Sequence, residues 1–327
     1  MERLDLQIDP YASDPGHWGA SLATLAEIMF PCLDAVAPGS VAEVGAYAGD
    51  LTRVILEWGS GRGVRTVAID PAPKEELIQL AEGHPELELI QQISLEGLRH
   101  ITLPDAVILD GDHNYYTVSE ELRLIEQRAA ESGALLPLVI LHDVGWPHAR
   151  RDSYYAPEEI PAEHRQPIVE GPRLYPGVPG VRSGGLPYHW AAATEGGPRN
   201  GVLTAAEDFV EGREGLRLAV IPAFFGLGMI WQLASSWSDA LAEIVDPWDR
   251  NPLLERLEEN RVLHLASSHF QLAEAARQAE QNARKDELLR EMLKSRAFTF
   301  AERLSWVHQR GKPAFTRDAV RKLLAGR

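Results

Sequence analysis

The segment VAEVGAYAGD, residues 41–50, decides the fold that we expect for the rest of the chain. Its apolar run over residues 41–44 predicts a β-strand. Gly45 ends this run, and a glycine can turn sharply because it has no Cβ. A helical pattern begins just after Gly49 and continues over residues 51–58. A strand, a glycine-containing turn and a helix form the first half of a βαβ unit, which predicts a parallel sheet.

Short apolar runs continue to alternate with helical patterns to about residue 141, and the alternation resumes after residue 200. It predicts a doubly wound, Rossmann-like α/β fold with a seven-stranded sheet and a closing antiparallel hairpin. The expected strands cover residues 41–44, 65–69, 87–91, 106–109, 135–141, 216–221 and 228–233. The expected helices cover residues 20–36, 51–58, 74–82, 118–132 and 204–210.

Three regions are expected along the chain. Residues 1–40 form a lead-in and a helix, residues 41–235 form the sheet domain, and residues 236–327 form a helical C-terminal region. We expect residues 144–200 to form an ordered insertion that covers the ligand site, because a loop this long inside a compact domain is usually functional. The helical tail would pack on its own domain or on a second subunit, which would make the protein a homo-oligomer.

Composition excludes several classes of protein. The 327 residues carry a formal net charge of −16, which argues against a nucleic-acid partner because phosphate binding needs concentrated Lys and Arg. The single cysteine excludes a disulfide framework and a cysteine-based zinc site. The chain shows neither a signal peptide nor an apolar stretch long enough to span a bilayer. We therefore expect a cytoplasmic protein without a membrane partner.

Two acidic residues accompany the first turn. Glu43 precedes Gly45 in the pattern E-x-G-x-x-x-G, and Asp70 ends the second expected strand. The G-x-G-x-x-G pattern that cradles a pyrophosphate is absent, and an acidic residue before the glycine suits a ligand with an ammonium group. Asp70 is placed to accept hydrogen bonds from ribose hydroxyls, although a helix-capping or turn role is the structural alternative. Together the two residues predict a nucleoside ligand.

Polar residues also follow the fourth and fifth strands. Asp110 and His113 come after the fourth strand, and His142 and Asp143 come after the fifth. His113 could act as a general base because the ordinary pKa of histidine is near neutrality, or it could be a turn residue that packs locally. Asp110 and Asp143 with a histidine would make a site for a divalent metal such as Mg²⁺ or Mn²⁺. The alternative is that Asp143 only orients His142.

These segments, in this order, resemble class I S-adenosylmethionine-dependent methyltransferases. The pattern D-G-x-H-x-Y at residues 110–115 and the H-D pair at residues 142–143 resemble the subgroup known as methyltransferase domain 24. The resemblance covers about residues 41–231. It implies that Glu43, Gly45 and Gly49 hold the methionine part of the cofactor, and that Ala46 and Tyr47 of the same turn also contact the cofactor. It further implies that Asp70 holds the ribose, that Ile93 and Ser94 lie near the adenine, and that Asp110 lines the methyl-transfer cleft.

A more distant resemblance is to the catechol O-methyltransferase group, whose members use magnesium. Asp110 and Asp143 fall where that group has two of its metal carboxylates, but Val144 replaces the Asn that follows the second Asp. His142, Asp112 or His113 would then have to complete the metal shell.

The function expected from the sequence is S-adenosylmethionine-dependent methyl transfer to a small-molecule acceptor in biosynthesis. The acceptor group would be a hydroxyl of a sugar or natural product, and His113, His142 and Asp143 would be the catalytic residues. Two alternatives stay open. One is an NAD-type oxidoreductase on a similar fold, and the other is a non-catalytic, methyltransferase-like scaffold that binds partners through its helical tail.

Overall fold

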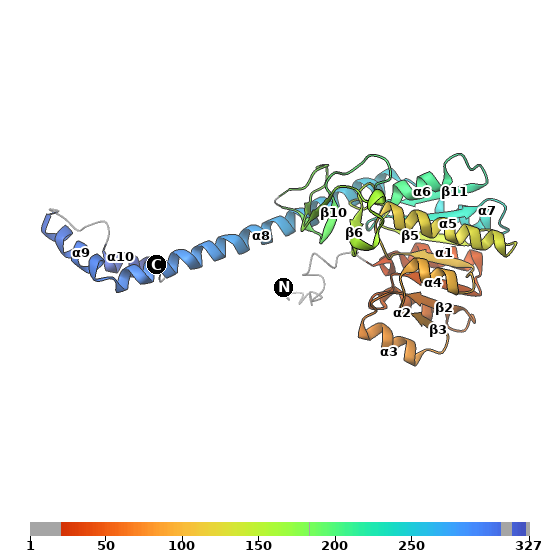
Figure 1. Cartoon of the computed structure of the whole chain (residues 1–327), viewed down its shortest axis with the longest axis horizontal. Helices are drawn as coiled ribbons and strands as arrows, with labels where there is room; N and C mark the ends of the chain where they lie inside the picture. Colours follow the sequence, from red (N-terminus) through yellow and green to blue (C-terminus); the bar gives the residue numbers. More distant parts are fainter. Residues whose placement is uncertain (1–20, 183, 309–315, 325–327) are drawn as a thin grey trace, which may run out of the picture. The chain divides into compact units, whose positions relative to one another are not determined.

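The computed structural model describes residues 21–182, 184–308 and 316–324 (Figure 1). The chain forms two compact units, one that extends up to Ser268 and one that begins at His269. The first unit holds a large sheet with its covering helices, and the described part of the second is helical. Within the described ranges, no helix combines the length and the apolar content needed to cross a membrane.

A seven-stranded sheet forms the centre of the first unit. Its strands are β1 (Ser40–Val44), β2 (Arg65–Ile69), β3 (Leu87–Ile90), β4 (Ala106–Leu109), β5 (Leu138–His142), β11 (Leu216–Ile221) and β12 (Leu227–Gln232). Their order is β11-β12-β5-β4-β1-β2-β3. The neighbouring pairs from β3 to β5 are parallel, whereas β12 runs antiparallel to both β5 and β11. The seven-stranded Rossmann-like fold and its closing antiparallel hairpin are therefore confirmed.

Helices cover both faces of this sheet, as a doubly wound fold requires. They are η3 (Leu22–Leu25, a 3-10 helix), α1 (Ala26–Val36), α2 (Asp50–Gly59), α3 (Glu75–Gly83), α4 (Ser94–His100), α5 (Tyr115–Glu131), α6 (Val202–Val210) and α7 (Ser238–Val245). On one face, Met29 of α1, Ile55 of α2 and Leu241 of α7 join the strands in one apolar core. On the other face, Leu122 of α5 and Ala205 of α6 belong to a second core. The strands are buried on both sides.

Two of the differences from the sequence prediction have a clear local cause. The short helix α4 was not predicted, because it contains Gly97 in its middle. A Cβ on Gly97 would lie 2.6 Å from the side chain of Ile69, so the glycine lets α4 pack closely on β2. Strand β5 begins at Leu138 and not at residue 135, because Pro137 has no N–H to donate to the sheet.

The segment between β5 and α6 contains short strands and turns. Its elements are β6 (Ser153–Tyr154), η4 (Pro157–Glu159), η5 (Ala162–His164), β7 (Ile168–Glu170), β8 (Arg173–Leu174), β9 (Leu186–Pro187) and β10 (Trp190–Ala192). Buried Asp152 fixes this insertion to the domain. Its Oδ1 accepts hydrogen bonds from the N–H groups of Tyr115 at 2.8 Å and Gly201 at 2.7 Å. The insertion is therefore held at the starts of α5 and α6.

The C-terminal region is helical, as the sequence predicts. Its helices are α8 (Pro252–Lys294), α9 (Arg296–His308) and α10 (Arg317–Leu324). The first turns of α8 belong to the first unit, where Val262, Leu265 and Ala266 form a small apolar cluster with Leu186 and Phe225.

The turn after β1 depends on the absence of a side chain at Gly45. Its φ is +86°, in the left-handed region that side chains rarely adopt. A Cβ at this position would lie 2.1 Å from the carbonyl oxygen of Asp110. The close approach at this glycine is with the loop after β4. Gly45 therefore lets the loops after β1 and β4 lie directly against each other.

We expect Gly45→Ala to lower the free energy of unfolding by more than about 3 kcal/mol, because a backbone clash adds to the cost of the positive φ. Gly61→Ala is the matched control. Gly61 has a φ of +75°, but no atom lies within 4 Å of its Cβ position, so only the conformational cost of about 1–2 kcal/mol should appear. Urea unfolding followed by circular dichroism measures both. Equal losses in the two variants would contradict the proposed contact.

Candidate functional site

The predicted site residues follow strands whose carboxyl ends meet at one edge of the sheet. The strand order reverses between β1 and β4, since β2 and β3 extend to one side of β1 and β5 extends to the other. Open α/β sheets bind ligands in the crevice at such a switch point. The register pairs Val44 with both Ile69 and Leu109. The residues that follow, Asp70 and Asp110, therefore flank the turn after β1.

Glu43 is buried within the sheet, where its side chain contacts α2. Its Oε2 accepts a hydrogen bond from the Thr52 hydroxyl at 2.6 Å. Burial raises the pKa of Glu43 to about 8, and the nearby carboxylates of Asp110 and Asp70 add to this shift while the Thr52 bond opposes it. A cation placed beside Glu43 would favour the ionised carboxylate.

Asp70 holds the turn after β1 through its carboxylate. Its Oδ2 accepts a hydrogen bond from the N–H of Tyr47 at 2.8 Å, and its Oδ1 accepts one from the N–H of Ala72 at 2.8 Å. The turn role given as an alternative is thus present. Each carboxylate oxygen keeps a second lone pair, so Asp70 can still accept hydrogen bonds from a ligand. The Tyr47 side chain beside it is 59% exposed.

The loop after β3 adds an exposed apolar side chain at the same edge. Ile93 is 42% exposed. Glu121 of α5 is buried, and burial raises its pKa to about 8, while an interaction with Ser94 opposes this shift. Ile93 therefore offers exposed apolar surface to a ligand.

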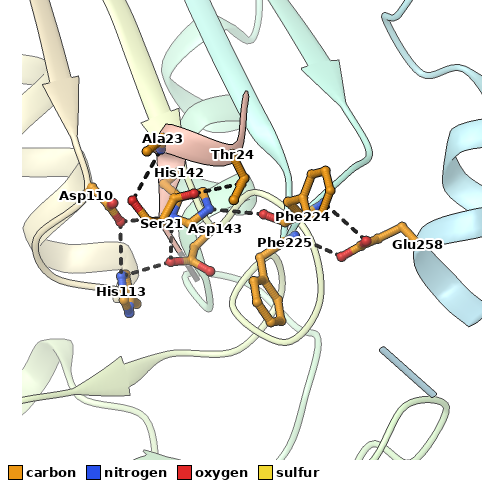
Figure 2. A network of polar contacts seen from close by, with 10 residues as sticks. All are labelled: Ser21, Ala23, Thr24, Asp110, His113, His142, Asp143, Phe224, Phe225 and Glu258. Carbon is orange, nitrogen blue, oxygen red and sulfur yellow. Dashed lines mark hydrogen bonds and ion pairs between the residues drawn. The ribbon is translucent and has the colours of Figure 1, made fainter. Parts of the chain in front are cut away.

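Four side chains gather beyond the ends of β4 and β5, and we call them the Asp–His cluster: Asp110, His113, His142 and Asp143 (Figure 2). Nδ1 of His142 lies 3.0 Å from Oδ1 of Asp110 and 3.5 Å from Oδ2 of Asp143. Nε2 of His113 lies 3.0 Å from the same Asp143 oxygen and 3.8 Å from Oδ1 of Asp110. The pairing of β4 with β5 brings the four residues together, as their places in the sequence predict.

The charges in the cluster depend on one another. Burial disfavours a charged imidazole, yet the neighbouring carboxylates hold the pKa of His113 well above its usual value and raise that of His142 to about 9. Burial also disfavours a charged carboxylate, but His113 and His142 hold the pKa of Asp143 well below its usual range. The cluster therefore combines an ionised carboxylate with positive charge held beside it.

The orientation of His142 is set by the turn between β11 and β12. Its Nε2 lies 3.1 Å from the carbonyl oxygen of Phe224. A carbonyl oxygen only accepts hydrogen bonds, so Nε2 carries the proton. Nδ1 is consequently the ring nitrogen that is turned toward Asp110 and Asp143 (Figure 2).

This turn is strained and is held by a residue that the sequence did not single out. Phe224 and Phe225 have φ values of 49° and 68°, and a positive φ is costly for residues with side chains. The carboxylate of Glu258 on α8 accepts hydrogen bonds from both N–H groups, at 3.1 Å and 2.8 Å (Figure 2). Arg261 pairs with Glu258 at 2.6 Å. These charge-assisted bonds offset the strain and keep the Phe224 carbonyl pointed at His142.

His148 is a further neighbour of the cluster that sequence reasoning missed. It is buried, and its ring centroid lies 4.6 Å from that of His113. One of its ring nitrogens lies within 4.8 Å of a ligating atom of His113 and of Asp143. Burial lowers the pKa of His148 to about 3. The path of the insertion brings His148 to the sheet edge. No local pattern in the sequence indicates that His148 reaches the site.

The structure also decides which residues can complete a metal shell with Asp110 and Asp143. His142 and His113 lie in the cluster, whereas Asp112 belongs to neither group of residues whose ligating atoms lie within 4.8 Å of one another. Oδ2 of Asp112 instead accepts a hydrogen bond from the Thr117 hydroxyl at 2.9 Å. Val144 is buried in the apolar core, so the residue after Asp143 supplies no ligand. The residues present do not form the oxygen-rich shell that Mg²⁺ prefers, and the expectation of Mg²⁺ is not supported by this donor set.

No protein-family model and no curated protein matches the chain. Among solved structures, it is similar to the S-adenosylhomocysteine-bound methyltransferase PaMTH1 of Podospora anserina, with 13% identity, 67% of this chain and 82% of that chain covered, and a TM-score of 0.40. It is also similar to human N-acetylserotonin methyltransferase in complex with S-adenosylmethionine, with 10% identity and a TM-score of 0.38. That match covers 68% of this chain and 55% of the human chain.

Removing the Glu258 carboxylate should loosen the turn that orients His142. We expect Glu258→Ala to lower the free energy of unfolding by about 1–3 kcal/mol, because two N–H groups lose a charged acceptor. Amide hydrogen exchange at residues 224–226 should become faster. Glu259→Ala is the matched control, because Glu259 is the exposed neighbour of Glu258 on the same helix. Unchanged exchange at residues 224–226 in Glu258→Ala would contradict this assignment.

Proposed function

We propose that this chain is an S-adenosylmethionine-dependent methyltransferase that methylates a hydroxyl group of a small molecule. One observation carries the proposal. Three acidic side chains surround the turn after β1 at the switch point of the sheet, and one of them, Asp110, also belongs to the Asp–His cluster: Glu43, Asp70 and Asp110. The three acidic side chains suit a cationic nucleoside, and the Asp–His cluster suits an acceptor that must lose a proton.

Charge distinguishes this cofactor from a dinucleotide. S-adenosylmethionine carries a positive sulfur and an ammonium group, and when bound it supplies a methyl group that a nucleophile can displace. An edge that gathers the carboxylates of Glu43, Asp70 and Asp110 attracts such a cation, whereas it would repel the pyrophosphate of NAD. The turn also lacks the glycine pattern that cradles a pyrophosphate. These two features favour the methyltransferase over the oxidoreductase.

The residues at this edge have lone pairs and exposed side chains that are free to contact the cofactor. Asp70 would hold the ribose hydroxyls through the lone pairs that its bonds to Tyr47 and Ala72 leave unused. The exposed side chains of Tyr47 and Ile93 would cover the adenine ring. Glu43 would stabilise the positive charge of the methionine part.

The acceptor would lie against the Asp–His cluster. The side chains of Asp110 and His113 are 19% and 16% exposed, whereas those of Asp143 and His142 are 8% and 2% exposed. Asp110 and His113 would therefore contact the acceptor, while the two buried residues orient them. The Tyr155 ring lies 5.7 Å from that of His113 and is 64% exposed, so the insertion would supply an apolar wall. Methyl transfer needs the acceptor oxygen to be aligned and deprotonated, and this arrangement could serve both needs.

Cofactor affinity should depend on the ionisation of Glu43. Its raised pKa of about 8 means that its carboxyl is mostly protonated at pH 6. Because a nearby ammonium or sulfonium favours the carboxylate, affinity should increase by about tenfold between pH 6 and pH 8.5. Isothermal titration calorimetry with S-adenosylmethionine measures this dependence.

Glu43→Gln should bind more weakly at pH 8.5 and should lose most of the pH dependence, while Asp70→Ala should weaken binding at every pH. NAD should not bind. Absence of S-adenosylmethionine binding, or NAD binding in its place, would overturn the proposed function.

Substitutions in the Asp–His cluster should reduce turnover much more than they reduce the affinity for the cofactor. With a panel of catechol, phenol and sugar acceptors, release of S-adenosylhomocysteine should fall at least about 100-fold in His113→Ala and in Asp143→Ala. The affinity for S-adenosylmethionine should change less than about threefold. His164→Ala is the control, because His164 lies on the insertion and stacks on Tyr116, outside the cluster. Full turnover in both cluster variants would contradict the assignment, and cofactor binding without turnover on any acceptor would favour the scaffold alternative.

A further inference from the structure

Five side chains with ligating atoms lie close together beyond the ends of β4 and β5. They form two overlapping sets that share Asp143: His113, Asp143 and His148 in one set, and Asp110, His142 and Asp143 in the other. In each set the ligating atoms lie within 4.8 Å of one another. The five residues come from three segments, the loop after β4, the end of β5 and the insertion, so the sequence does not show them as one group.

Three of the four separations measured within the Asp–His cluster match the edges of a coordination shell, and the fourth is longer. Metal–ligand distances of about 2.0–2.2 Å place neighbouring ligands about 3.0 Å apart in an octahedron and about 3.4 Å apart in a tetrahedron. Nδ1 of His142 is 3.0 Å from Asp110 and 3.5 Å from Asp143. Nε2 of His113 is 3.0 Å from Asp143 and 3.8 Å from Asp110.

Within the part of the chain that the structure describes, two buried ring nitrogens of this group make no hydrogen bond. Nδ1 of His148 has none, and His148 is only 5% exposed. Nε2 of His113 also makes no aligned hydrogen bond, although the Asp143 carboxylate lies 3.0 Å away. Buried polar atoms nearly always have partners, so an unpartnered nitrogen on a buried histidine that lies beside His113 and Asp143 points to a ligand at this place.

The hydrogen bond of His142 has the arrangement found around metal-bound histidines. Such a histidine donates its second N–H to a carboxylate or a backbone carbonyl, which fixes the free nitrogen on the metal. Nε2 of His142 donates to the Phe224 carbonyl, and Nδ1 lies 3.0 Å from the Asp110 carboxylate. In neutral His142 two lone pairs would face each other there, so a cation must lie between them. That cation is either a proton or a metal ion.

The donor atoms indicate the class of metal. Mg²⁺ prefers a shell of oxygen ligands, whereas imidazole nitrogens suit Zn²⁺, Fe²⁺, Co²⁺ and Ni²⁺. This group has three imidazoles and two carboxylates, and Val144 adds no oxygen ligand.

We propose that the Asp–His cluster and His148 bind one divalent first-row transition-metal ion that prefers nitrogen ligands. His148 comes from the insertion, so the ion would also link the insertion to the sheet edge. The location of the site follows from the donor atoms alone. Only the role of the ion, which is to stabilise the ionised acceptor hydroxyl, rests on the proposed function.

The test uses full-length protein stripped of metal with a chelator and titrated without cofactor. Calorimetry with ZnCl₂ should show one equivalent bound with a Kd below about 1 μM, and MgCl₂ should bind at least about 100-fold more weakly. CoCl₂ should produce visible absorption bands typical of nitrogen ligation. His148→Ala should weaken Zn²⁺ binding at least about tenfold, whereas His164→Ala, a histidine of the same insertion outside the group, should leave it unchanged.

Thermal unfolding without metal verifies that His148→Ala is folded, and His113→Gln provides a second variant that should lose affinity for Zn²⁺. Absence of Zn²⁺ and Co²⁺ uptake below about 1 mM, tighter binding of Mg²⁺ than of Zn²⁺, or unchanged affinity in His148→Ala would each overturn the inference. S-adenosylmethionine binding is measured separately on the stripped protein. Cofactor binding without Zn²⁺ uptake would overturn this inference alone, and Zn²⁺ uptake without cofactor binding would overturn only the proposed function.

Discussion

The contact between the backbone of Gly45 and the carbonyl of Asp110 is the constraint on which the site depends. A side chain at residue 45 would lie 2.1 Å from that carbonyl oxygen, so the loops after β1 and β4 can meet only because the residue is glycine. The contact falls at the switch point of the sheet, where ligands bind in folds of this kind. It places Asp110 between the acidic turn that would hold a cofactor and the cluster that would hold an acceptor.

From Asp110, a chain of hydrogen bonds leads to the start of α8. His142 lies between Asp110 and the Phe224 carbonyl, and Glu258 holds the strained turn that presents this carbonyl (Figure 2). The insertion reaches the same point from another direction and brings His148 next to His113. The chemistry proposed for this edge therefore depends on three parts of the chain: the sheet, the insertion and the first turns of α8.

Much of this edge could be predicted from the sequence, because Asp70, Asp110 and Asp143 each follow or end an apolar run. In a parallel sheet the carboxyl ends of such runs share one edge, so local patterns fix the arrangement. His148 and Glu258 could not be predicted in the same way. They lie in an irregular insertion and in a helix without strong apolar periodicity, and their positions result from tertiary packing. The short helix α4 was missed because Gly97 weakens its local pattern, while its packing on Ile69 requires that glycine.

In the function proposed for this chain, the acidic turn and the Asp–His cluster are the two halves of one methyl-transfer site. A crystal structure of the protein with S-adenosylhomocysteine would test this arrangement. The ribose hydroxyls should lie on Asp70, the amino-acid part should lie at the turn after β1, and the sulfur should face Asp110 and His113. A ligand bound at another edge of the sheet, or a sulfur directed away from the cluster, would contradict it.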